Sequence, residues 1–190
     1  MKNSGSPGLE PEAGDVCPRI RVMLVISNLE YGGAQRQVVE LANNLDPRRV
    51  EVHVCSLSPF VPLASALRIP ADRVHVIVKR TKYDLTVVPK LARLIDRVGA
   101  DVVHGYLFDA EIAVRLAGRA RKVAVVAGSE RNTDYHLKRV QRLVYRLTRS
   151  CVDLIIANSS HASSASPGSP LPSPIRVLAA VNAPGSRAQP

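Results

Sequence analysis

Short apolar runs alternate with amphipathic segments along the middle of the chain. Ile20–Ile26 is almost continuously apolar, which is typical of a strand covered on both faces of a sheet. Further apolar or alternating runs predict strands over Val50–Ser56, Val74–Val78, Asp101–His104, Lys122–Ala127 and Asp153–Ala157. Apolar residues at helical spacing predict helices over Ala34–Leu45, Leu85–Val98, Asp109–Gly118 and Tyr135–Arg149. We expect Gly118 to end its helix. The alternation predicts an α/β fold with a doubly wound, mostly parallel sheet.

Proline and serine mark the limits of this folded body. No proline occurs between residues 90 and 166, whereas both ends of the chain are rich in Pro, Gly and Ser. We therefore expect residues 1–19 to be a flexible leader and residues 162–190 to be a Ser/Pro/Ala-rich tail, both disordered. Within that tail only Ile175–Val181 has strand-like character. The folded domain is expected to span residues 20–161.

Ligands of doubly wound sheets bind beyond the carboxyl ends of the strands. The segment Ser27–Gly33 follows the first predicted strand and places Gly32 and Gly33 at the start of a helix. Paired glycines let a ligand approach the backbone, and the positive helix end favours a phosphate. A tight turn without a ligand is the alternative. The sequence contains neither GxGxxG nor GxxxxGK[ST], which disfavours NAD enzymes and P-loop NTPases.

Three runs of the sequence, in the same order, resemble glycosyltransferase family 4 (group 1), which has the GT-B architecture. They are RVMLVISNLEYGGAQRQVVELANNLDPRRVEVHVCSL, DVVHGYLFDAEIAVRLAGR and VAVVAGSERNTDYHLKRVQRLVYRLTRSCVDLIIANSSHA. The resemblance covers about residues 20–161 and implies a Rossmann-like, N-terminal, acceptor-side half of a GT-B enzyme. The family transfers a sugar from a nucleotide-sugar donor to a saccharide or lipid-linked acceptor, usually with retention. The resemblance implies that the protein needs no metal and no cofactor, since the nucleotide-sugar is a co-substrate.

The family's second domain carries most donor contacts and a Glu-x7-Glu motif. No two glutamates of this chain have that spacing. We therefore expect the chain to be half of an enzyme, inactive alone, with a C-terminal donor-binding half supplied in cis or in trans. The alternative is a non-catalytic α/β module that binds a phosphosugar or an anionic membrane surface.

The resemblance and the loop positions together give the candidate substrate- or phosphate-binding residues. They are Gly32, Gly33, Ala34, Gln35, Arg36, His104, Arg131 and Asn132. His104, at the predicted end of its strand, is either a ligand contact or a hydrogen-bonded strand-end histidine. Arg131 either binds a phosphate in bidentate fashion or pairs with Glu130. Arg131 and Asn132 belong to the predicted loop Gly128–Thr133, which follows the fifth predicted strand. Many family members have a histidine in this loop, but this chain does not, so no catalytic residue is assigned.

The chain is strongly basic, with a net charge of +10, which favours anionic partners. Ten Lys or Arg residues but only two acidic residues lie between Arg115 and Arg149. The candidate membrane-facing residues are Lys138, Arg139, Arg142, Arg146 and Arg149. The alternative is a solvated face on a helix whose apolar stripe packs against the sheet. Nucleic-acid binding is disfavoured because the chain has two Phe, five Tyr and no Trp.

No apolar run reaches the ~18 residues of a membrane span, and the polar N-terminal segment is unlike a signal peptide. The three cysteines are widely spaced and follow no metal-binding or disulfide pattern. We therefore expect a cytoplasmic protein without a metal site, with the cytoplasmic face of the membrane as a candidate location.

Overall fold

The computed structural model of the chain describes residues 18–81, 84–130, 139–157 and 176–179. The strands among them are β1 (Ile20–Ile26), β2 (Val50–Ser56), β3 (Val74–Val76), β4 (Val102–Tyr106), β5 (Val125–Glu130), β6 (Leu154–Ala157) and β7 (Arg176–Ala179). The helices are α1 (Gly33–Asn44), α2 (Val87–Val98), α3 (Phe108–Ala120) and α4 (Arg139–Leu147). Three 3-10 turns complete the described elements: η1 (Pro62–Ala66), η2 (Ala71–Arg73) and η3 (Arg149–Cys151).

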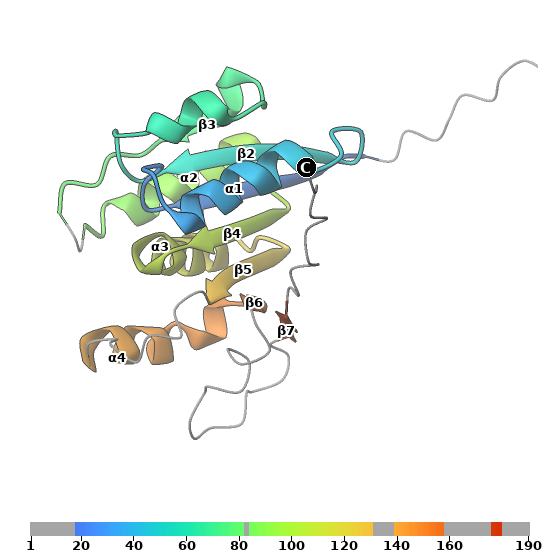
Figure 1. Cartoon of the computed structure of the whole chain (residues 1–190). Helices are drawn as coiled ribbons and strands as arrows, with labels where there is room; N and C mark the ends of the chain where they lie inside the picture. The colour runs from blue at the N-terminus through green and yellow to red at the C-terminus, as the bar shows by residue number, and fades with distance from the viewer. Residues whose placement is uncertain (1–17, 82–83, 131–138, 158–175, 180–190) are drawn as a thin grey trace, which may run out of the picture.

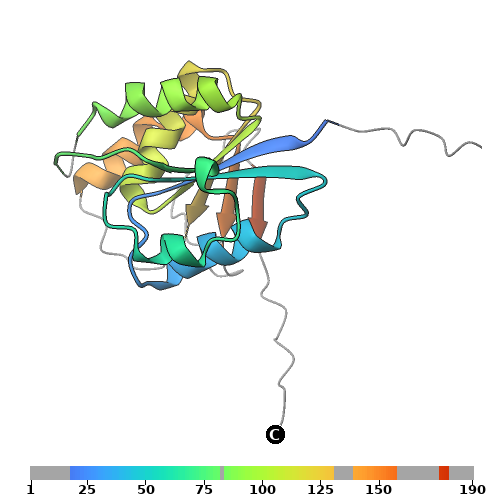
Figure 2. The same ribbon diagram turned by 90° about the horizontal axis from the view of Figure 1, so that it is seen from above.

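The described strands form one parallel sheet in the order β3-β2-β1-β4-β5-β6-β7. Helix α1 covers one face of the sheet, and α2 and α3 cover the other (Figures 1 and 2). The predicted doubly wound α/β fold is therefore confirmed.

The central strand β1 is apolar from Val22 to Ile26, as is typical of a strand covered on both faces. Met23 and Val25 pack in the core beneath α2 and α3, and Leu24 and Ile26 pack in the core beneath α1. All four side chains are at most 1% exposed. The buried Cys55 belongs to the first of these cores, where burial raises the pKa of its thiol to about 12. A buried free cysteine of this kind packs as a small apolar side chain.

The structure corrects the predicted end of the third helix. Gly118 does not end α3, which continues to Ala120. A Cβ atom on Gly118 would lie 2.8 Å from Val126 Cγ2 and 2.9 Å from Val103 Cγ2. Gly118 therefore lets the helix lie close to the sheet, and its lack of a side chain serves packing rather than termination.

The bounds of two neighbouring strands, β4 and β5, also differ from the predictions. β4 continues two residues past His104, and β5 begins at Val125 rather than at Lys122. The longer α3 places Lys122 in the connecting turn, where it adopts φ 54°. The predicted loop Gly128–Thr133 therefore begins as strand, since β5 ends at Glu130.

The strand-like segment predicted near the C-terminus is present as β7, which pairs with β6. β7 lies beyond residue 161, so the sheet includes four residues of the segment expected to be a disordered tail. The remainder of residues 162–190 and residues 1–17 lie outside the described part of the chain.

Candidate functional site

The order of the strands reverses direction between β1 and β4, and we expect a ligand crevice at this point. These strands are neighbours, with Ile26 paired with Tyr106 at their carboxyl ends. The helix that follows β1 covers one face of the sheet, whereas the helix that follows β4 covers the other (Figure 2). Such a point of reversal is where open α/β sheets bind ligands.

The loop after β1 is held by both neighbouring segments. Ser27 Oγ accepts a hydrogen bond from the backbone N–H of Ala110 in α3, over 3.4 Å. Leu29 is fully buried, and its carbonyl accepts the N–H of Leu63 in η1 at 3.1 Å. Tyr31, two residues later, is 73% exposed. The loop is therefore fixed at its base and open toward solvent before α1 begins.

The first turn of α1 has no side-chain cap. Gly32 precedes the helix in an extended conformation, and the first turn contains no acidic residue. Gln35 is turned toward the loop, where its Nε2 donates to Asn28 Oδ1 at 2.6 Å. A Cβ atom on Gly33 would meet no other atom within 4 Å. No side-chain cap satisfies the first backbone N–H groups of α1, and the positive end of a helix is suited to an anion.

The structure brings Gly32, Gly33, Ala34, Gln35 and Arg36 together in this turn. The N–H of Arg36 is used inside the helix, since it donates to the carbonyl of Gly32 at 3.0 Å, and its side chain is exposed. Phosphate binding by these residues remains a prediction.

The start of α3 forms the other wall of the crevice, and sequence reasoning missed its main features. Leu107 adopts φ 67° and ψ 153°, a strained conformation for a residue with a side chain. Two residues later, Asp109 forms an ion pair with Lys79 Nζ. Lys79 follows β3 and Asp109 follows β4, so both lie at the carboxyl edge of the sheet. This shared position is the feature of the sequence that could have indicated their proximity.

His104 does not end its strand as predicted. It lies within β4, is 6% exposed, and has its Nε2 2.9 Å from Ser129 Oγ on β5. Its ring also packs against that of Tyr106, with centroids 4.2 Å apart. His104 is therefore a hydrogen-bonded histidine, as the second of the two interpretations had it, but it lies in the middle of β4 rather than at its end.

Arg115 is not part of a solvent-facing basic patch. It is 4% exposed and pairs with the equally buried Glu111 one helical turn earlier. Tyr145 of α4 donates its hydroxyl to Glu111 Oε2 at 2.8 Å, and the Arg115 guanidinium lies 4.7 Å from the centre of the Tyr145 ring. This buried charge pair therefore fastens α4 to α3.

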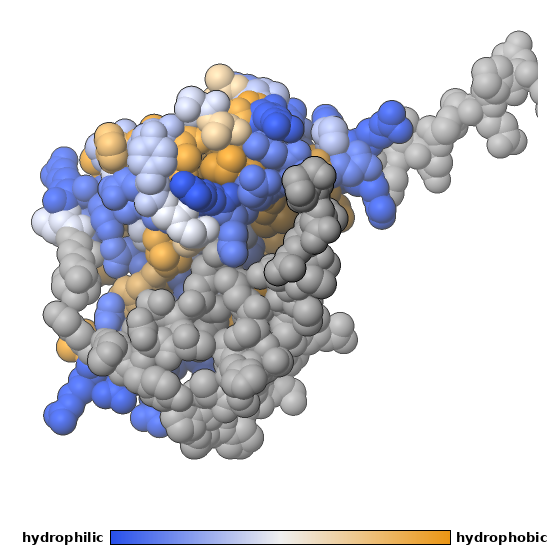
Figure 3. All heavy atoms as spheres, viewed as in Figure 1, coloured by the Kyte–Doolittle hydropathy of each residue, from blue (hydrophilic) through white to orange (hydrophobic). Residues whose placement is uncertain are grey.

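The arginines of helix α4 are exposed, and so are some of its apolar residues. Arg139, Arg142 and Arg146 are exposed, whereas Arg149 in η3 is half-buried. Val140, Leu143 and Leu147 are 62%, 55% and 72% exposed. The alternative in which this stripe packs against the sheet is therefore wrong for these three residues. Hydrophilic side chains and a small apolar spot are both visible at the lower left of Figure 3, where α4 lies in Figure 1.

Three of the predicted site residues, Arg131, Asn132 and Lys138, lie outside the described part of the chain. Among the described residues, no group of three or more His, Cys, Asp or Glu side chains is arranged to hold a metal ion. Across the same residues, no helix has both the length and the apolar character needed to cross a bilayer.

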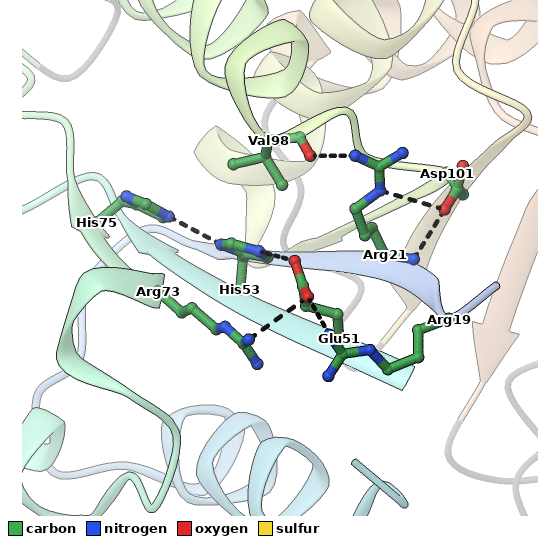
Figure 4. Close-up of polar contacts among 8 residues, drawn as sticks. All are labelled: Arg19, Arg21, Glu51, His53, Arg73, His75, Val98 and Asp101. Carbon is green, nitrogen blue, oxygen red and sulfur yellow. Dashed lines mark hydrogen bonds and ion pairs between the residues drawn. The ribbon is translucent and has the colours of Figure 1, made fainter. Parts of the chain in front are cut away.

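A second polar cluster joins β2 to the short edge strand β3 (Figure 4). His53 Nδ1 lies 3.1 Å from His75 Nε2, and His53 Nε2 lies 3.2 Å from Glu51 Oε1. Burial lowers the pKa of His75, to which the nearby charges of His53 and Arg97 add, against Asp72. The hydrogen bond with His53 lowers the pKa of Glu51, and the Arg73 and Arg19 charges act in the same direction. These contacts fasten the sheet edge.

The fold resembles that of several proteins of known structure. Anabaena HepE, solved with UDP and glucose, matches with TM-score 0.61 and 16% identity over 85% of this chain and 44% of that protein. The lipopolysaccharide outer core galactosyltransferase WaaB matches with TM-score 0.60 and 13% identity over 90% of this chain and 50% of that protein. UDP-GlcNAc 2-epimerase from Neisseria meningitidis, bound to UDP-GlcNAc, matches with TM-score 0.54 and 15% identity over 76% of this chain and 42% of that protein.

These matches establish similarity of fold, and the chain spans at most half the length of the three proteins. No curated protein matches the sequence. Residues 31–178, which are most of the chain, match the family described as Glycosyltransferase Family 4. The chain therefore belongs to glycosyltransferase family 4.

Proposed function

We propose that the chain acts in the transfer of a sugar from a nucleotide-sugar donor to a saccharide or lipid-linked acceptor. The observation that supports this most strongly is the uncapped start of α1 at the crevice between β1 and β4. Its uncapped N–H groups and positive helix end suit the phosphate of a nucleotide-sugar. The nucleotide-sugar is the co-substrate in this proposal, and no metal or other cofactor takes part.

The proposal assigns the chain to the acceptor side of a GT-B enzyme. A donor-binding half, in cis or in trans, would close over the carboxyl edge of the sheet and complete the site. The similar proteins of known structure are about twice as long as the part matched here, which supports this division. On this account the chain alone lacks transferase activity.

A fusion enzyme tests the proposed transfer. The 190-residue chain would be joined to the C-terminal half of a family 4 enzyme. The turnover of UDP- and GDP-sugars by this fusion would then be measured. The Gly33→Asp variant places a carboxylate where the phosphate would lie. Its negative charge also stabilises the positive end of α1, so the fold should be retained. Gly33→Asn is the matched neutral control, because both side chains enter open space.

We expect turnover in the fusion and in Gly33→Asn but a loss of turnover in Gly33→Asp with the fold retained. Equal turnover in the two variants would contradict the phosphate site. Donor binding without turnover would favour the alternative, a non-catalytic module that recognises a phosphosugar.

A membrane-peripheral location is a second proposal, supported by α4. Its exposed arginines are close to exposed valine and leucine side chains on the same helix. Basic residues near an anionic surface contribute roughly 1 kcal/mol each, and adjacent apolar side chains add insertion into the interface. This would place the enzyme at the cytoplasmic face of the membrane.

A further inference from the structure

A polar pocket lies at the amino ends of β5 and β6, whereas the sugar transfer is proposed at the carboxyl ends of the strands. Its volume is about 490 Å³, within the range of pockets that bind small molecules. The end of α3 and the turn after it form one wall, and η3 forms another. The polar residues of the lining are Arg119, Lys122, Ser150, Cys151 and Asp153.

The turn that closes α3 places Lys122 in a position that usually belongs to glycine. The N–H of Lys122 donates to the carbonyl of Arg119 at 3.2 Å, and the N–H of Val123 donates to that of Gly118 at 3.0 Å. These are the two hydrogen bonds of a Schellman motif, whose left-handed residue is here Lys122, with φ 54°. Glycine adopts this conformation without a steric penalty, whereas a residue with a side chain does not. A lysine is thus kept at the pocket in a strained conformation, which is typical of functional positions.

Arg119 lies on the face of α3 that is directed toward η3. It follows Arg115 by one helical turn, so the two side chains share a face of the helix. Arg115 Nη1 donates to Thr148 Oγ1 at 3.4 Å, directly before η3 begins. Unlike the buried Arg115, Arg119 is exposed, and it lines the pocket. Arg119 and η3 therefore face the same space.

Neither cation of the pocket is neutralised by a neighbouring side chain. Arg119 and Lys122 form no ion pair with another described residue. The adjacent Arg121 differs, because it pairs with Asp96, and neither of those two residues lines the pocket. The positive charges of Arg119 and Lys122 are therefore free to bind a ligand.

The acidic side chain in the lining already has a structural role. Among the described residues that line the pocket, Asp153 alone is acidic. Its Oδ2 accepts the N–H of Val126 at 2.9 Å, and its own N–H donates to the carbonyl of Val126 at 2.9 Å. The carboxylate therefore joins the start of β6 to β5. With two cations and one carboxylate, the lining keeps a net positive charge, which favours an anionic ligand.

We propose that this pocket binds the phosphate monoester of a small polar molecule, with Arg119 and Lys122 on the phosphate and Ser150 beside the organic part. Such a phosphate carries nearly two negative charges at neutral pH, which the two cations match. Arginine binds phosphate through its planar fork, and lysine binds it as a point charge. The pocket has the volume of many water molecules, so it has room for an organic group beside the phosphate. The proposal does not rest on the proposed sugar transfer.

An amide NMR titration of the 190-residue chain with ribose 5-phosphate tests the site. Ribose and inorganic phosphate, titrated separately, are the two fragments of this probe. We expect saturable shifts of the amides of Lys122, Val123 and Cys151, and weaker binding of either fragment. Shifts confined to the start of α1 would overturn the proposal, because the probe would then occupy only the phosphate site proposed there. Inorganic phosphate that binds as tightly as ribose 5-phosphate would also overturn it.

Two substitutions remove the cations in turn. Arg119→Gln and, separately, Lys122→Gly should each weaken the binding of ribose 5-phosphate about tenfold, the effect of losing one charge-assisted hydrogen bond. Arg121→Gln is the matched control, because it removes the same charge from a side chain that pairs with Asp96 instead. Its effect on affinity should stay below about twofold, since only a screened, distant charge is lost. Unchanged affinity in both pocket variants would overturn the proposal.

Lys122→Gly also separates ligand binding from folding. Because glycine relieves the strain of the left-handed conformation, this variant should melt at the temperature of the wild type or above it, while its affinity falls. Ribose 5-phosphate should raise the melting temperature of the wild type more than that of the variant. A lysine that serves only the fold would give the opposite result, a lower melting temperature with unchanged affinity, and that result would overturn the role proposed for Lys122.

Discussion

At the scale of single residues, Gly118 and His104 have roles or positions in the structure that differ from those predicted. Gly118 has the spacing of a helix terminator, yet it serves the close contact of α3 with β4 and β5. His104 stands within β4 and bonds to Ser129. Sequence alone could not distinguish these roles, because both depend on which residues of neighbouring strands lie opposite. Leu107 was missed for a similar reason, since nothing in its side chain indicates a positive φ.

Substitution of Gly118 tests its packing role. Gly118→Ala would place a methyl group against two buried valine side chains, and overpacking of this kind costs about 1–3 kcal/mol. Alanine also gains about 1 kcal/mol of helix propensity, so we expect a net loss of about 1 kcal/mol in chemical denaturation. Gly33→Ala, whose Cβ enters open space, is the control. Stability equal to or above that of the wild type in Gly118→Ala would contradict the packing account.

The lowered pKa of His75 predicts that the stability of the fold depends on pH. Burial lowers the pKa of His75 from 6.5 in the folded state, so the unfolded chain binds a proton first as the pH falls. The free energy of unfolding should therefore decrease as the pH falls below 6.5, until the folded-state pKa of His75 is reached. The pKa of Glu51 is lowered from 4.5 by its hydrogen bond to His53, so its stabilising contribution should be lost as the pH falls below 4.5.

Urea denaturation between pH 4 and 8 measures this dependence. His75→Gln should flatten the decrease below pH 6.5, whereas the exposed Arg68→Gln should retain it. An unchanged pH profile in His75→Gln would show that His75 does not cause the decrease below pH 6.5.

At the scale of elements, predictions were most accurate where both faces of a strand are buried. β1 and β2 have the predicted bounds. The polar residues Arg19 and Ser27 flank the apolar run of β1, and the alternating run of β2 ends at the polar Ser56. β5 was displaced because the apolar run Lys122–Ala127 crosses from a turn into a strand. The exposure of the α4 stripe could not be predicted, since helical periodicity is the same whether an apolar face is packed or free.

The exposed face of α4 predicts salt-sensitive binding to anionic vesicles. Exposed charges are screened beyond about 8 Å at physiological ionic strength, so cosedimentation should weaken as salt rises, and neutral vesicles should bind poorly. Replacing Arg139, Arg142 and Arg146 with Gln should reduce binding. The same change at Arg48, Arg49 and Arg68 should not. Equal sedimentation of both variants and the wild type would show that the α4 arginines are only solvated.

At the scale of the whole molecule, the chain is a family 4 domain with one edge available for a ligand. The order of the strands in the structure places that edge between β1 and β4, whereas the sequence predicted only that the sheet is doubly wound and mostly parallel. The pairing of Lys79 with Asp109 across it depends on the folded register and was not predictable.

The 190-residue chain by itself should not transfer sugar. If the reaction takes place between two halves, contacts that stabilise the transition state are missing from one half alone. The measurement is release of nucleotide from UDP- and GDP-sugars by the purified chain, with the fusion enzyme as the positive control. Sustained turnover by the chain alone would contradict the assignment of a single acceptor-side half.

The most direct test of the phosphate site is an amide NMR titration of the 190-residue chain with UDP. UDP carries the phosphates that nucleotide-sugar donors of this kind share, and the amides of Gly33, Ala34 and Gln35 report on the uncapped turn of α1. We predict saturable shifts of these amides in the wild type and in Gly33→Asn, and their loss in Gly33→Asp. Shifts confined to other parts of the chain, or shifts that persist in Gly33→Asp, would contradict the proposed phosphate site.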